Sequence, residues 1–183
     1  MDSILPLVQV AEAMAQKYEV VVTNPPYMSV SATAPKLNTY VVKNYPDSKA
    51  DMFAVFMERC GAMLKPNGYQ AMITMHAWMF LSSFEKLRAK LLQTDTVNLV
   101  HLGARAFEEI GGEVVQTAAF VFRNSKVPGL RAVYERLIDP NSQSGKEQLF
   151  LAHTNQYEAR TCDFAIIPGA PTAYWINKNW IEA

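Results

Sequence analysis

Four consecutive residues, Asn24, Pro25, Pro26 and Tyr27, combine groups that could hold a reacting amine. The Asn24 side-chain carbonyl is a hydrogen-bond acceptor, and the Pro25 carbonyl has no amide hydrogen on Pro26 to occupy it. Two fixed acceptors suit an amino group that carries two hydrogens, and they would stabilise charge developing on its nitrogen. The Tyr27 ring could stack on a planar base beside them. The four residues therefore predict nucleophilic attack by an amine attached to a flat group.

An apolar strand must hold these residues in place. Residues 18–23 (YEVVVT) have the composition of a parallel strand that is buried on both faces. Proline cannot donate to a sheet ladder, so the strand ends at Thr23 or Asn24, and the two prolines keep the next residues extended. The alternative is that Asn-Pro-Pro-Tyr is only a turn. Its place after a buried strand of an α/β chain favours a functional role.

The surrounding sequence alternates helices and strands, which indicates an α/β layer fold. Residues 4–17 predict an amphipathic helix with Pro6 in its first turn, and Asp51 predicts the cap of a helix at residues 52–64. Residues 28–50 predict a long loop with at most a short helix. The other predicted elements are a helix at residues 82–93 and strands at residues 68–75, 97–102 and 116–123.

The pattern weakens after residue 124. Residues 131–138 predict a helix, and the polar stretch 139–148 predicts a loop and a boundary. We therefore divide the chain into a catalytic part at residues 1–125 and an irregular extension at residues 126–183.

Composition indicates a soluble globular chain and excludes several classes of protein. Of the 183 residues, 50% are hydrophobic, and 17 basic residues balance 17 acidic ones. A chain that binds nucleic acid by itself usually carries a basic excess, so any DNA-binding face is expected to be local or supplied elsewhere. The two cysteines and three histidines have no metal-ligand spacing. With no signal peptide and no apolar stretch of ~18 residues, we expect a cytoplasmic protein.

The chain resembles the amino-group DNA methyltransferases that carry an Asn/Asp-Pro-Pro-Tyr motif and methylate adenine at N6. It looks closest to the large, PglX-like methyltransferases of bacterial restriction-modification and phage-exclusion systems. Besides NPPY, the resemblance rests on residues 51–74 (DMFAVFMERCGAMLKPNGYQAMIT) and 101–122 (HLGARAFEEIGGEVVQTAAFVF). A weaker echo lies at residues 171–175 (PTAYW).

The resemblance implies roles for individual residues. Asn24 and Pro25 would bind the exocyclic amine of adenine, and Pro26 would keep the loop rigid. Tyr27 would stack on the flipped base.

Three further positions are implied by the resemblance alone. Phe107 falls where the family places a second aromatic wall of the base pocket, with a core residue that anchors the loop as an equal alternative. Asp51 and Phe56 fall beside the methyl-donor pocket, although a plain helix cap and a plain core residue are at least as well supported.

The same resemblance implies the fold, which is the C-terminal half of a Rossmann-like α/β sheet of an S-adenosyl-L-methionine-dependent methyltransferase. Strands 18–23, 68–75 and 97–102 are expected to be parallel, with strand 116–123 antiparallel between the last two. Residues 126–183 would lead toward a target-recognition region.

The family's cofactor loop is missing from this chain. S-adenosyl-L-methionine is bound in the family by a glycine-rich loop that precedes the NPPY strand, but the first glycine here is Gly61. We therefore expect a piece of a larger methyltransferase, whose partners are double-stranded DNA and the missing N-terminal cofactor half. The open edge of such a half-sheet predicts self-association or modest stability.

Two other functions fit the same residues. A protein-glutamine methyltransferase would also hold a flat group that ends in NH₂, although the long loop after NPPY favours DNA. A non-catalytic methyltransferase-like module would dock on a partner and transfer nothing, which would fit the neutral charge and the absent cofactor loop.

Overall fold

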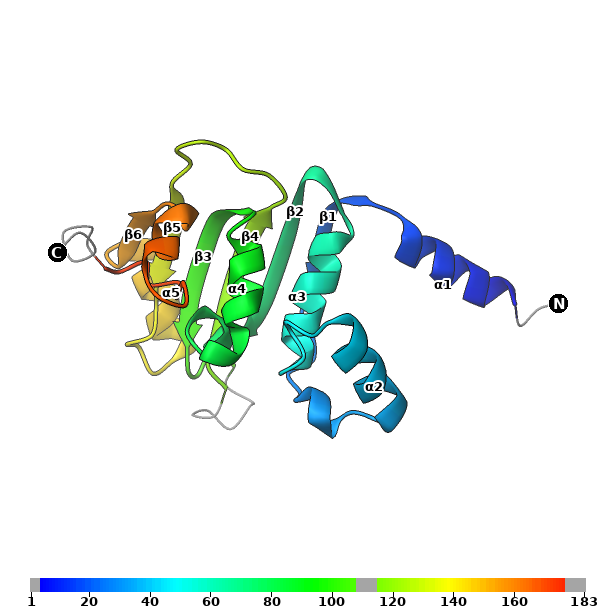
Figure 1. Ribbon diagram of the computed structural model, residues 1–183. Coiled ribbons are helices and arrows are strands. Elements are labelled where there is room, and N and C mark those ends of the chain that lie inside the picture. The colour runs from blue at the N-terminus through cyan, green and yellow to red at the C-terminus, as the bar shows by residue number, and fades with distance from the viewer. Residues whose placement is uncertain (1–3, 108–114, 177–183) are drawn as a thin grey trace.

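One mixed sheet of six strands runs through the computed structural model, which describes residues 4–107 and 115–176 (Figure 1). β1 is parallel to β2, and β4 is antiparallel to both β2 and β3. The predicted arrangement of the first four strands is therefore confirmed. The strands, in the spatial order β1-β2-β4-β3-β5-β6, are β1 (Tyr18–Thr23), β2 (Leu64–Met75), β3 (Asp95–Gly103), β4 (Thr117–Arg123), β5 (Ala132–Arg136) and β6 (Gln156–Ala159).

Helices cover one face of this sheet. In Figure 1, α3 (Met52–Ala62), α4 (Glu85–Leu91) and α5 (Gln143–Ala152) lie in front of the strands. Buried and half-buried residues alternate along most of β2 and β4, as expected for strands with one covered face. The main core lies between the helices and the sheet and includes Phe53, Met57, Met72, Leu99 and Phe120.

Two local features join α3 to the sheet. The predicted cap of α3 is confirmed, because Asp51 Oδ1 accepts a hydrogen bond from the Phe53 backbone N–H at 3.2 Å. The turn at KPNG is tight: Asn67 has a φ of 65°, and a Cβ on Gly68 would lie 2.9 Å from the Glu19 carbonyl oxygen. A glycine at this position lets β2 pass closely beside β1.

β1 differs from the prediction of a strand buried on both faces. Val20 and Val22 are 54% and 70% exposed, while Val21 packs against the core. The reason is that β1 is an edge strand, with no strand beyond it among residues 4–107 and 115–176. The predicted helix before it forms as α1 (Leu5–Ala15), but it buries no residue and extends away from the sheet (Figure 1). Neither α1 nor any other helix of the described residues is long and apolar enough to cross a membrane.

Four other expectations need correction. The long loop contains a ten-residue helix, α2 (Pro35–Asn44), and the predicted helix at residues 82–93 is a 3₁₀ turn (Ser82–Phe84) followed by α4. The predicted helix at residues 131–138 is instead strand β5, which pairs in parallel with β3. The predicted loop at residues 139–148 contains the start of α5. The extension after residue 125 is therefore not irregular, although its lead toward a target-recognition region stays a prediction.

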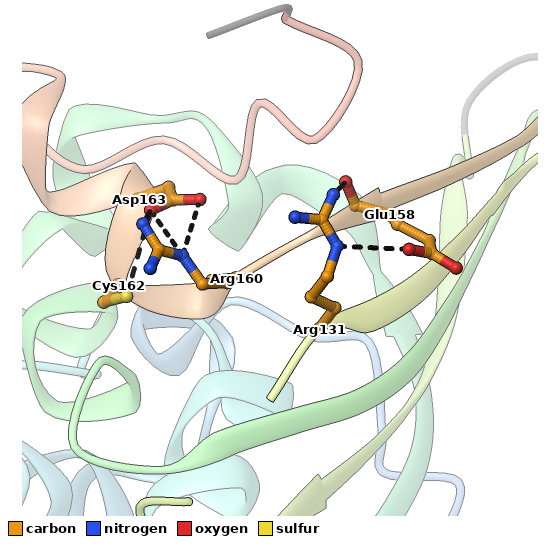
Figure 2. A network of polar contacts seen from close by, with 5 residues as sticks. All are labelled: Arg131, Glu158, Arg160, Cys162 and Asp163. Carbon is orange, nitrogen blue, oxygen red and sulfur yellow. Dashed lines mark hydrogen bonds and ion pairs between the residues drawn. The ribbon is translucent and has the colours of Figure 1, made fainter. Parts of the chain in front are cut away.

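Two arginine–carboxylate pairs fix the last strand and the turn after it (Figure 2). Arg131 Nε donates to Glu158 Oε2 at 3.1 Å, and its terminal nitrogen donates to the Glu158 carbonyl at 3.1 Å. Arg160 donates to Oδ1 of the buried Asp163 at 2.6 Å, and the Cys162 thiol lies 3.9 Å from the same oxygen. The first pair attaches β6 to the residue before β5, and the second joins the residue after β6 to the following 3₁₀ turn.

Candidate active site

The Asn-Pro-Pro-Tyr segment begins where β1 ends. β1 pairs with β2 up to Thr23, which lies opposite Met72. Asn24 and Pro26 are exposed, and Pro25 is buried. Among the described residues, no hydrogen bond occupies the Asn24 side chain or the Pro25 carbonyl. The exposed Asn24 side chain can therefore accept a hydrogen bond from a ligand at the carboxyl end of β1, and the Pro25 carbonyl has no partner among the described residues although Pro25 is buried.

Tyr27 is held against the neighbouring strand. Its hydroxyl donates a hydrogen bond to the Ile73 carbonyl of β2 at 3.1 Å, and its half-buried ring packs against the main core. Burial raises the pKa of the Tyr27 hydroxyl to about 12, so the group stays neutral and remains a donor at any ordinary assay pH. The contact fixes one end of the ring beside the two free acceptors.

Asp51 joins the Asn-Pro-Pro-Tyr loop to α3. Besides capping α3, Asp51 Oδ1 accepts from the Met28 backbone N–H at 3.1 Å, directly after Tyr27. The Met52 backbone N–H in turn donates to the Met28 carbonyl at 2.9 Å. Burial raises the pKa of the Asp51 carboxyl, although its backbone N–H partners act in the opposite direction. These contacts give Asp51 a structural function; its predicted contact with the cofactor stays a prediction.

Phe56 lies at the meeting point of two apolar clusters. Its half-buried ring packs against the main core and against a smaller cluster of Val30, Val41, Met52 and Val55. The smaller cluster supports the segment after Tyr27 and α2. Phe56 is therefore a packing residue in the described structure, and its predicted place beside the methyl donor stays a prediction.

Phe107 comes from the loop after β3 and is half-buried. Met75 of β2 and Gly103 of β3 both lie opposite Thr117 of β4, so the two strands reach the same height. β1 is separated from β3 by three strand spacings, or about 14 Å. Phe107 and Asn24 thus follow the carboxyl ends of parallel strands, at the same end of the sheet, with β2 and β4 between them. Its role as a wall of a base pocket stays a prediction, and Gly111 and Gly112 of the same loop lie outside the described residues.

A buried chain of hydrogen bonds at this edge was not anticipated. His76 Nδ1 lies 2.7 Å from His101 Nε2, and His101 Nδ1 lies 3.0 Å from the Tyr174 hydroxyl. Burial lowers the pKa of both histidines, that of His101 to about 3, so both rings are neutral. The network fastens residues 171–176 over β3, and the scattered positions of its members in the sequence gave no signal for it.

β1 pairs with β2 on one side, and no strand lies on its other side among residues 4–107 and 115–176. The described residues that precede β1 include no glycine. The predicted binding of S-adenosyl-L-methionine and of a flat amine both stay predictions.

Comparisons with known proteins agree with the predicted family and fold. The family model of the Eco57I restriction-modification methylase matches residues 5–107. The adenine-specific methyltransferase PglX of Lacticaseibacillus casei (strain Zhang) is 48% identical in an alignment of 182 positions that covers 96% of this chain. The adenine-specific methyltransferase BrxX of Escherichia coli O9:H4 (strain HS) is 42% identical over 181 residues, or 98% of this chain. This chain spans 15% of the length of each relative.

A solved structure with little sequence identity has the same fold. The type I restriction-modification methyltransferase subunit of Streptococcus thermophilus superposes with a TM-score of 0.56 and 14% identity. The likeness covers 86% of this chain and 38% of the subunit. The mixed sheet with its antiparallel β4 therefore has the predicted α/β fold, which it shares with part of a methyltransferase subunit.

Proposed function

This chain belongs to the Eco57I restriction-modification methylase family, and on that premise we propose that it carries the adenine-binding part of a DNA adenine-N6 methyltransferase. The whole protein would act in a bacterial restriction-modification or phage-defence system. The observation that supports this most directly is the pair of free acceptors, the Asn24 side chain and the Pro25 carbonyl, at the end of an edge strand. The names of both curated relatives favour the same substrate.

In the proposed reaction, a flipped adenine donates the two hydrogens of its amino group to Asn24 Oδ1 and the Pro25 carbonyl. The two acceptors orient the nitrogen and stabilise the positive charge that develops on it. A proton leaves once that charge has formed, so no strong general base is required. Tyr27 stacks on one face of the base, and Phe107 closes the pocket from β3. S-adenosyl-L-methionine, when bound, supplies the methyl group.

The rest of the longer protein is the proposed source of the cofactor site. It would add strands to the open edge of β1 and cover the exposed apolar side chains of α1, among them Leu5, Leu7 and Val10. Double-stranded DNA is the second proposed partner. Without these partners the same surfaces favour self-association.

Replacement of Asn24 in the full-length protein tests the proposal. Asn24→Ala should lower the rate of methyl transfer to an adenine-containing duplex by about a hundredfold or more, because one preorganised partner of the charged nitrogen is lost. The temperature of unfolding should not change, because Asn24 is exposed. Asn98→Ala, at an exposed position in β3, is the matched control and should leave the rate unchanged. Full activity of Asn24→Ala would instead favour a non-catalytic docking module.

The substrate class needs a separate comparison. The full-length protein should transfer methyl groups to an adenine-containing duplex and not to a glutamine-containing peptide. Transfer to the peptide alone would refute the adenine assignment and support a protein-glutamine methyltransferase. Detection of N6-methyladenine in the digested duplex identifies the product.

A further inference from the structure

One helix holds the start of the loop that carries Phe107, where the chain leaves β3. Lys146 Nζ of α5 donates hydrogen bonds to the Leu102 and Leu137 carbonyls, each at 2.6 Å. Gln143 Nε2, at the first residue of α5, donates to the Ala106 carbonyl at 3.2 Å. Two of these bonds therefore reach Leu102, near the end of β3, and Ala106, which precedes Phe107.

The turn between these two carbonyls has an unusual backbone. Gly103 and Arg105 have φ values of 66° and 58°, in the left-handed region. A Cβ on Gly103 would lie 3.0 Å from the Ile138 side chain, so the segment between β5 and α5 packs closely against the turn. A backbone in this conformation persists where neighbouring contacts hold it.

Lys146 is also unusual for a lysine. Its side chain is only 4% exposed, and burial lowers its pKa. A buried ammonium group that donates to two carbonyls joins β3, β5 and α5 at one point. Loss of either partner would leave a buried polar group without its bond, so the arrangement is geometrically strict.

From these contacts we propose that α5 is a positioning element of the base pocket, and that Gln143 and Lys146 set the place of Phe107. The inference rests on the proposed function, because it assigns Phe107 to the face of the target adenine. Neither Gln143 nor Lys146 touches the base in this account, and both act through the loop. The part of the chain after residue 125 would then contribute to methyl transfer as well as to the sheet.

Gln143 gives the cleaner test, because it is exposed while removal of the buried Lys146 endangers folding. In the full-length protein, Gln143→Ala should slow single-turnover methyl transfer to an adenine-containing duplex about threefold to tenfold, the cost of one hydrogen bond. The temperature of unfolding should fall only slightly, because the lost hydrogen bond is exposed. Gln148→Ala, at an exposed residue of the same helix, is the matched control and should leave the rate unchanged.

A double-mutant cycle shows whether Gln143 acts through Phe107. Gln143→Ala should have no further effect on the rate when Phe107→Ala is already present. If the two losses multiply, or if Gln143→Ala alone has no effect, the inference is overturned. If Phe107→Ala leaves the rate unchanged while Asn24→Ala removes activity, the positioning role is refuted and the proposed function stands.

Discussion

The Tyr27 ring is anchored by its hydroxyl and is half-buried against the main core. The hydrogen bond to the Ile73 carbonyl fixes the far end of the side chain on β2, while the motif backbone fixes the near end. The types of the motif residues predicted acceptors and an aromatic surface. They could not predict the Ile73 contact, because it joins residues 46 positions apart.

Substitutions of Tyr27 should separate anchoring from stacking. Tyr27→Phe keeps the ring and loses one hydrogen bond, so it should lower the free energy of unfolding by about 1 kcal/mol and keep most of the methyl transfer rate. Tyr27→Ala also removes the stacking surface, and its rate should fall about tenfold to a hundredfold. Denaturant unfolding and single-turnover kinetics of the full-length variants give both quantities. Equal rates for the two variants would contradict a stacking role.

At the scale of elements, a helix cap followed by an apolar stripe was enough to predict a helix. A short apolar pattern without a cap was not enough, because strand pairing decided the structure there. The cap at Asp51 and the apolar stripe after it predicted α3 within two residues of its observed end. Residues 131–138 (RAVYERLI) carry apolar side chains at helical spacing, yet Ala132 and Tyr134 are buried on a strand because β3 supplies a pairing edge. α5 was missed because a serine- and glycine-containing start resembles a loop, although Ser142 caps it through the Gly145 N–H.

Asp51 joins the segment after Tyr27 to the start of α3, so its substitutions should change the stability of the fold. Asp51→Asn keeps an acceptor for the Met28 and Phe53 N–H groups, whereas Asp51→Ala removes it and should cost about 1 to 2 kcal/mol of unfolding free energy. Because burial raises the pKa of Asp51, its protonated form is favoured in the folded state. The stability of the wild-type protein relative to Asp51→Asn should therefore fall as pH rises from the ordinary aspartate pKa of 3.8 through the higher folded value.

Denaturant unfolding between pH 3 and 7 measures this difference. An Asp51→Asn variant as unstable as Asp51→Ala would contradict the structural account. A normal stability of Asp51→Asn together with a much weaker affinity for S-adenosyl-L-methionine would instead support the predicted cofactor contact.

At the scale of the whole molecule, the exposed strand β1 and the unpacked helix α1 are the clearest departures from the predicted burial. Their apolar composition predicted buried elements, but Val20 and Val22 of β1 are exposed and α1 buries no residue. The order and direction of the first four strands were predicted from the resemblance to the methyltransferase family, and the structure confirms them. The sequence could not predict β5 and β6, because short strands of mixed polarity form only where an existing edge pairs with them.

Calorimetric titration with S-adenosyl-L-methionine tests most directly whether this chain is the adenine-binding part of a divided active site. The full-length protein should bind the cofactor, and the 183-residue chain should show no binding at the same concentrations. Binding of the cofactor by the chain with an affinity close to that of the full-length protein would contradict the account. In that case the chain completes a cofactor site without the rest of the protein.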